Sequence, residues 1–177
     1  HVSPGDVRYI GIDRRIMALP QVVRVQDELR IDGELFLFSG VNGTHAPQWS
    51  NSALKEKTEN GFRQDRLAHE QCLVITQEGR RTLLSGCAHN GILDILARYR
   101  ALFGAYPDTV VSGFHMMKKT AYTPEEERYI RETAEKLRQT GARFYTGHCT
   151  GEGALHLMQQ VMGDRLHALH SGLIFEV

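Results

Sequence analysis

The chain has 177 residues, of which 41% are hydrophobic and 24% charged, so a disordered chain is excluded and a globular one is expected. Its 21 basic and 21 acidic side chains give a formal net charge of zero, so a general nucleic-acid binder is not expected. No apolar run approaches the roughly 20 residues of a membrane span, so no membrane association is expected either.

The three cysteines, an odd number, do not make a disulfide framework and favour a reducing, cytoplasmic location. No signal peptide is recognisable, although the chain opens at His1 without a methionine, which leaves its natural start open. The length fits one domain over residues 1–177, in which residues 1–66 read as irregular and residues 67–177 as regular.

Few regular elements are predicted in the irregular part. A turn is expected over residues 2–6, and short strands are expected over residues 21–25 and 34–38. Residues 39–61 are rich in Gly, Asn, Ser and charge, and they predict a long surface loop of the kind that is usually functional or disordered.

The regular part opens with a hairpin and a helix. Residues 72–76 and 81–86 predict two strands joined by a turn at Gly79. Residues 91–103 have apolar side chains at helical spacing, and Asn90 is placed to cap that helix.

Strands and helices then alternate to the end of the chain. The helix over residues 123–141 has the clearest signals, since Thr123 and Glu126 make a capping box, Pro124 lies in the first turn and Gly141 ends it. This alternation predicts a layered α/β fold. The other elements expected here are strands over residues 108–114, 142–147, 165–169 and 173–177 and a helix over residues 151–163.

Nine histidines are a high number for this length, and three of them directly follow the ends of predicted strands. These are His89 in "SGCAH", His115 in "SGFH" and His148 in "TGHCTG", and His69 lies just before a strand. Layered α/β proteins bind ligands at the carboxyl ends of strands, and the glycine before each histidine allows a sharp turn. Neutral imidazoles on one rim are ligands for zinc, iron or manganese, so a metal site is predicted.

The helix starts after two of these histidines add a predicted anion site. Backbone N–H groups at a helix start bind anions, and glycine keeps the approach open. The dipeptides Asn90–Gly91 and Thr150–Gly151 are therefore expected to hold a phosphate beside the metal.

Each of these signals also has a structural interpretation. One strand-end histidine is more often a hydrogen-bonded structural residue than a ligand, but three in similar places favour a site. Cys87 could be either a metal ligand or a small buried hydrophobic residue. Cys149 is expected to be a small buried hydrophobic residue, and Cys72 is expected in the core. The side chains read as structural or solvated are His156, His167, His170, Arg80 and Arg81, and the pair Lys118–Lys119, which can nevertheless meet an anion near His115.

Three segments resemble the metallo-β-lactamase fold family. They are "HEQCLVITQEGRRTLLSGCAHNGILDIL", "VVSGFHMM" and "GHCTGEGALHLM", and their motifs are similar to the branch that contains the 7,8-dihydropterin-6-methyl-4-(β-D-ribofuranosyl)aminobenzene-5′-phosphate synthases. The resemblance covers about residues 64–177, and "RYIGID" also fits it. It implies an αββα sandwich with two divalent metal ions, either zinc or manganese or iron, at the edges of the sheets.

The resemblance also implies roles for individual residues. His69 corresponds approximately to a metal-binding histidine before the hairpin, and His148 corresponds to the last histidine ligand. Cys87 stands where the family carries an aspartate, so His89, two residues on, is the expected replacement ligand. His115 lies where related branches carry a substrate-facing histidine, which implies substrate binding or proton transfer.

The family's signature, histidine–any–histidine–any–aspartate–histidine, does not occur in these 177 residues. The chain is therefore expected to represent the later two-thirds of a domain. The remaining third is expected before His1, on a second chain, or to be absent altogether. The expected function is metal-dependent hydrolysis of a phosphorylated or phosphodiester small molecule. The alternatives left open are a condensing enzyme of the synthase type and a non-catalytic binding or regulatory module, with a homo-oligomer as a possible assembly.

Overall fold

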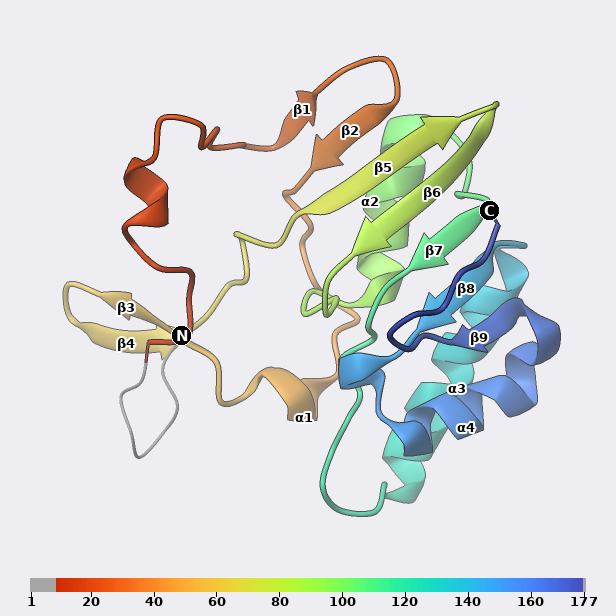
Figure 1. Ribbon diagram of the computed structural model, residues 1–177. Helices are drawn as coiled ribbons and strands as arrows, with labels where there is room; N and C mark the ends of the chain where they lie inside the picture. The colour runs from red at the N-terminus through yellow and green to blue at the C-terminus, as the bar shows by residue number, and fades with distance from the viewer. Residues whose placement is uncertain (1–8, 177) are drawn as a thin grey trace.

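The structure is a computed structural model that describes residues 9–176, so the turn predicted over residues 2–6 lies outside the described residues. A mixed sheet of seven strands, in the order β1-β2-β5-β6-β7-β8-β9, forms the centre of this part of the chain (Figure 1). Its strands are β1 Glu28–Arg30, β2 Leu35–Phe38, β5 Cys72–Gln77, β6 Arg80–Ser85, β7 Thr109–Val111, β8 Arg143–Thr146 and β9 Leu166–Ala168.

The direction of the strands changes in the middle of the sheet. The pairs β1–β2, β2–β5 and β5–β6 are antiparallel, whereas β6–β7, β7–β8 and β8–β9 are parallel. Because parallel strands end at the same edge, the turns after β6, β7 and β8 emerge side by side. These are the three turns that carry His89, His115 and His148.

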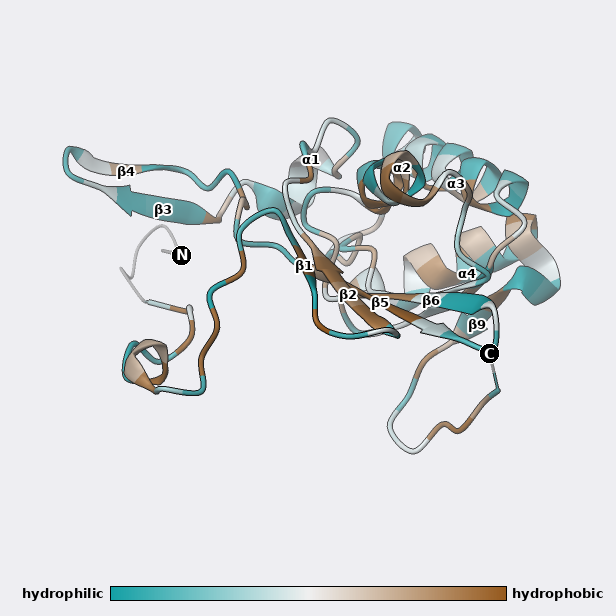
Figure 2. Ribbon diagram, turned by 90° about the horizontal axis from the view of Figure 1, so that it is seen from above, coloured by the Kyte–Doolittle hydropathy of each residue, from teal (hydrophilic) through white to brown (hydrophobic). Residues whose placement is uncertain are grey.

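Three helices cover one face of the sheet, as Figure 2 shows from above. They are α2 Ile92–Phe103, α3 Pro124–Gln139 and α4 Glu152–Met162. The helix-facing side chains of the strands form one line across the sheet and are buried against these helices. In register the line reads Phe36, which is partly buried, then Val74, Leu83, Val110, Phe144 and Leu166.

The opposite face of the sheet is also apolar, but it is only partly covered. Its central line crosses every strand of the sheet, and most of its side chains are half-buried. Tyr145 is the buried exception, because the ring of Phe175 stacks on it at 3.7 Å. In register the line reads Leu29, Leu37, Leu73, Leu84, Val111, Tyr145 and His167.

A smaller unit lies between β2 and β5 in the chain. It consists of the short helix α1 Gln48–Asn51 and a separate hairpin of β3 Lys55–Thr58 and β4 Gly61–Gln64, which projects from the body in Figure 1. The long loop predicted over residues 39–61 therefore contains regular structure, because the polar composition concealed a two-stranded hairpin.

Most elements predicted for the regular part are confirmed. The β5–β6 hairpin turns at Gly79, whose φ is 77°, and the capping box of Thr123 and Glu126 begins α3. The cap of α2 was predicted one residue early, since Gly91 rather than Asn90 occupies it without a side-chain bond. Residues 21–25 and 173–176 are not strands, and β1 was not predicted.

Candidate active site

Hydrogen bonds join the three turns that carry the strand-end histidines. The Gly113 N–H donates to the carbonyl of Gly86 at 2.8 Å, which holds the end of β7 against the turn after β6. The Phe114 N–H donates to the hydroxyl of Thr150 at 2.9 Å, which holds the same segment against the turn after β8. The predicted convergence of His89, His115 and His148 on one edge therefore agrees with the structure.

The backbone of these turns is strained at non-glycine residues. Ala88, His115 and His148 have φ values of 55°, 49° and 50°, in the left-handed region that side chains other than glycine rarely adopt. Strain of this kind persists only where the surroundings fix it, and it gathers at functional sites. All three positions lie within one residue of, or at, a candidate histidine.

His89 and His115 form the centre of the site. Their ring centroids lie 4.0 Å apart with 54° between the ring planes. The pKa of His89 is lowered to about 4, mainly by burial and also by the nearby His115 and His69, while Asp65 opposes this shift. Burial also lowers the pKa of His115, against a hydrogen bond to the Ser50 carbonyl that raises it. Neutral imidazoles are therefore favoured at both positions at neutral pH.

The other two histidines lie around this pair. His148 lies close enough to His115 to lower its pKa, and His69 lies close enough to His89 to do likewise. The four histidines therefore share one region of the structure. His148 and His69 are both exposed. His148 borders a pocket of about 710 Å³ together with Gly151, while His89 borders a second pocket of the same volume beside the loop of residues 41–47. His89 and His148 thus border two different pockets.

Glu70, which was not singled out from the sequence, holds the turn of His89. Its carboxylate accepts the N–H of His89 at 2.7 Å, the N–H of Asn90 at 3.0 Å and the Asn90 side-chain amide at 2.9 Å. Glu70 directly follows the predicted ligand His69, and this position is the signal in the sequence that could have identified it. Through its bond to the N–H of His89, Glu70 connects the segment of His69 to the turn of His89.

Much of the anion prediction does not agree with this geometry. The N–H groups at Asn90 are occupied by the Glu70 carboxylate, whose charge repels an anion, and Gly91 is packed against the backbone of residues 45 and 46. Thr150 is fully buried, and its hydroxyl bonds Phe114 and Thr146. These contacts disfavour an anion at Asn90, Gly91 and Thr150. The anion site stays a prediction, and Gly151 lines the pocket beside His148.

The cysteines divide as the sequence indicated. Cys72 is buried in the core, and burial raises its pKa to about 12. Cys149 is also buried, and its thiol donates to the carbonyl of Cys87 at 3.6 Å. Burial, with the nearby Cys87, raises the pKa of the Cys149 thiol to about 12, so it is protonated at neutral pH. Cys87 is half-buried, and the question of its role stays open.

The donor set fits part of a metal site. Neutral imidazole nitrogens at His89 and His115 have the chemistry of zinc, manganese or iron ligands. Within residues 9–176, however, no three His, Cys, Asp or Glu side chains are grouped as a metal ion requires. The predicted ligands His69, Cys87, His89 and His148 are thus not grouped around one point among the described residues, and the ring next to that of His89 is His115.

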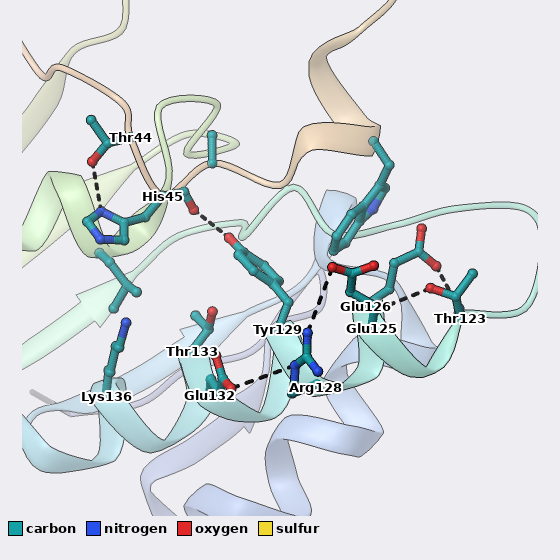
Figure 3. A pocket seen from close by; sticks show the side chains of 13 residues that line it. Thr44, His45, Thr123, Glu125, Glu126, Arg128, Tyr129, Glu132, Thr133 and Lys136 are labelled. Atoms are coloured by element: carbon teal, nitrogen blue, oxygen red, sulfur yellow. Dashed lines mark hydrogen bonds and ion pairs between the residues drawn. The ribbon is translucent and has the colours of Figure 1, made fainter.

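A separate cavity of about 600 Å³ lies between α3 and the loop of residues 44–49, away from the strand-end turns (Figure 3). Its charges pair with one another, since Arg128 faces Glu125 and Glu132, and the hydroxyl of Tyr129 donates to the backbone of His45. The bond from Tyr129 to His45 fastens the loop to α3, and we assign the cavity a structural role.

Comparisons with known proteins place the fold. A crystal structure of a metal-dependent hydrolase of the β-lactamase superfamily superposes with a TM-score of 0.73 and 24% identity, over 87% of this chain and 57% of that one. The chain has the metallo-β-lactamase fold. The seven-stranded sheet corresponds to one of the two sheets of the expected αββα sandwich. Helices cover one of its faces, and half-buried apolar side chains line the other.

A curated relative gives a second comparison. The 7,8-dihydropterin-6-methyl-4-(β-D-ribofuranosyl)-aminobenzene-5′-phosphate synthase of Methanocaldococcus jannaschii is 29% identical over 123 residues, which are 68% of this chain. The matched region spans only 40% of that protein. No family model matches the chain. Among its described helices, none combines the length and the apolar character needed to cross a membrane.

Proposed function

We propose that this chain provides part of the active site of a metal-dependent hydrolase that acts on a phosphorylated or phosphodiester small molecule. The observation that carries the proposal is the pair of His89 and His115, two imidazoles held 4.0 Å apart at the ends of β6 and β7. The metal-dependent hydrolase with the same fold supports the reaction class, and the name of the curated relative, which contains a phosphate, supports the substrate class.

The chain's own residues can bind the substrate and move a proton. Divalent ions, when bound, would supply an activated water molecule. His115 has a lowered pKa, so it is suited to accept a proton at neutral pH rather than to donate one as a general acid. The pocket that His89 borders, of about 710 Å³, provides room for a substrate beside one ring of this pair.

A condensing enzyme is the second candidate, and the sequence relative favours it because that protein is a phosphate synthase. Both reactions would use the same histidine pair. Hydrolysis of bis(p-nitrophenyl) phosphate with manganese or zinc distinguishes them, since a condensing enzyme has no need to cleave this diester.

The His115→Ala variant tests the proposal in the purified protein. We expect turnover of the diester to fall about 10²-fold or more, as loss of an acid–base group typically causes, while metal content and folding are unchanged. His156→Ala is the matched control, because His156 is exposed on α4 and its ring contacts the exposed side chain of Gln160. Loss of metal in His115→Ala would make His115 a ligand, and full activity would make it structural. A protein with neither metal nor turnover contradicts the enzyme proposal and favours a binding module.

A further inference from the structure

The short helix α1 is fastened tightly beside the histidine pair. Trp49 donates its indole N–H to the carbonyl of Met116 at 3.3 Å. Its ring also makes edge-to-face contacts with the rings of Tyr122 and Tyr129, at centroid distances of 6.4 and 5.3 Å. On the other side, the amide of Gln64 donates to the Asn51 carbonyl at 2.8 Å. A four-residue helix has little stability of its own, so these contacts determine its position.

Asn51 bonds His89 twice, and the two bonds together determine the proton's place on the ring. A backbone carbonyl can only accept a hydrogen bond, so the atom of Asn51 that lies 2.6 Å from the His89 carbonyl is the donor Nδ2. The Oδ1 of Asn51 must therefore be the atom that faces His89 Nδ1 at 3.1 Å. An amide oxygen accepts but never donates, so Nδ1 must carry the proton. The lone pair of the neutral ring then lies on Nε2.

Ser50, the neighbour of Asn51 in α1, determines which nitrogen of His115 carries the proton, and here it is Nε2 rather than Nδ1. The backbone carbonyl of Ser50 lies 3.2 Å from Nε2 of His115. Because a carbonyl is only an acceptor, Nε2 carries the proton and the lone pair lies on Nδ1. Among the described residues, no hydrogen bond occupies His89 Nε2 or His115 Nδ1.

We propose that α1 sets opposite tautomers on the two paired histidines, with Asn51 as the positioning residue that leaves Nε2 of His89 free for a ligand or a proton. This inference rests on the proposed function for the use of that nitrogen, but the tautomers themselves are properties of the folded chain. Partners of this kind orient catalytic and metal-binding histidines in proteins generally. No sequence motif marks Asn51, which lies inside a long polar segment.

Nitrogen-15 spectra of the imidazole rings test the proposal in the full chain at pH 7, with signals assigned by His89→Gln and His115→Gln. We expect a protonated Nδ1 on His89 and a protonated Nε2 on His115. In Asn51→Leu, the ratio of Nδ1–H to Nε2–H forms of His89 should fall about tenfold, as loss of one hydrogen bond implies. Asn51→Asp keeps an acceptor and should keep Nδ1 protonated.

The tautomers can be measured without any enzymatic activity, so this test is independent of the hydrolase assay. Asn60→Leu, at an exposed position between β3 and β4, should change neither ring, and Asn51→Ala replaces Asn51→Leu if the larger side chain prevents folding. A proton on Nε2 of His89 in the unchanged protein, or a tautomer ratio insensitive to Asn51, overturns the proposal. The expected tautomers in a protein without diester hydrolysis support the role of α1 and count only against the hydrolase.

Discussion

A methyl group on residue 113 would lie 2.5 Å from the sulfur of Cys149, so these two residues are in direct contact with no room for a side chain between them. Gly113 follows β7 and Cys149 follows β8. The contact brings the segment that carries His115 against the turn that carries His148. Glycine is thus required here for close approach, and only secondarily for turning.

Gly113→Ala is therefore expected to destabilise the protein by about 1–3 kcal/mol, because an extra carbon in a closed contact forces neighbouring atoms apart. Urea unfolding followed by circular dichroism measures the change. The double variant Gly113→Ala, Cys149→Ala removes the obstructing sulfur and should recover most of the loss. Simple addition of the two single effects would show that the contact does not limit residue 113.

Glu70 gives a second stability prediction. Glu70→Ala leaves the N–H groups of His89 and Asn90 without their acceptor, and one such partly buried loss costs about 1–3 kcal/mol. Glu70→Gln retains one acceptor oxygen and should cost less. Thermal unfolding compares both with Glu59→Ala, an exposed position in the β3–β4 turn. Equal stability of Glu70→Ala and Glu59→Ala would contradict the role assigned to the carboxylate.

Sequence patterns predicted the part of the site that depends on strand ends. His89, His115 and His148 each follow an apolar strand, and the order of β6, β7 and β8 in a parallel sheet brings their ends together. The resemblance added the sandwich fold, which the structural comparison supports. These inferences succeeded because they depend on periodicity and topology, which the chain encodes locally.

The partners of these histidines could not be predicted in the same way. Asn51 and Ser50 reach the site from a segment that reads as a loop, and their contacts depend on how Trp49 packs. The anion prediction is disfavoured at Asn90 because Glu70, which lies 20 residues earlier in the chain, accepts its N–H groups. Side-chain partners across long separations depend on the packed structure, and composition alone does not reveal them.

The histidine pair predicts a pH dependence of stability. The pKa of His89 is about 4 in the folded protein, below its ordinary value of 6.5, because burial disfavours the charged ring. The unfolded chain therefore binds more protons in this interval, so stability is full above pH 6.5 and falls as the pH drops toward 4. Allowing for solvent screening of the half-buried ring, we expect a loss of about 1–2 kcal/mol.

Chemical unfolding at pH 7 and at pH 5 measures this loss. His89→Gln should remove most of the difference between the two pH values, since glutamine does not titrate there. His156→Gln is the control, because His156 is exposed on α4. A pH dependence that survives in His89→Gln would assign it to other groups, of which His115, with its lowered pKa, is the first to examine.

The second face of the sheet gives the last prediction. Strands covered on one face only usually alternate apolar and polar side chains, but β5 and β6 are apolar on both faces, as in strands covered on both sides. Leu73 on this face is half-buried, whereas its neighbour Val74 faces the helices and is fully buried. The adjacent pair therefore makes a matched test of which face supports the fold of the 177-residue chain.

Leu73→Lys should cost no more than about 1 kcal/mol in urea unfolding, since the lysine head can reach water from a partly open face. Val74→Lys buries a charge among the helices and should prevent folding. Because an exposed apolar line favours association, Leu73→Lys should also reduce concentration-dependent self-association, measured by sedimentation velocity. Unfolding of Leu73→Lys as complete as that of Val74→Lys would mean that this face is already covered within the chain, by the segment whose Phe175 stacks on Tyr145.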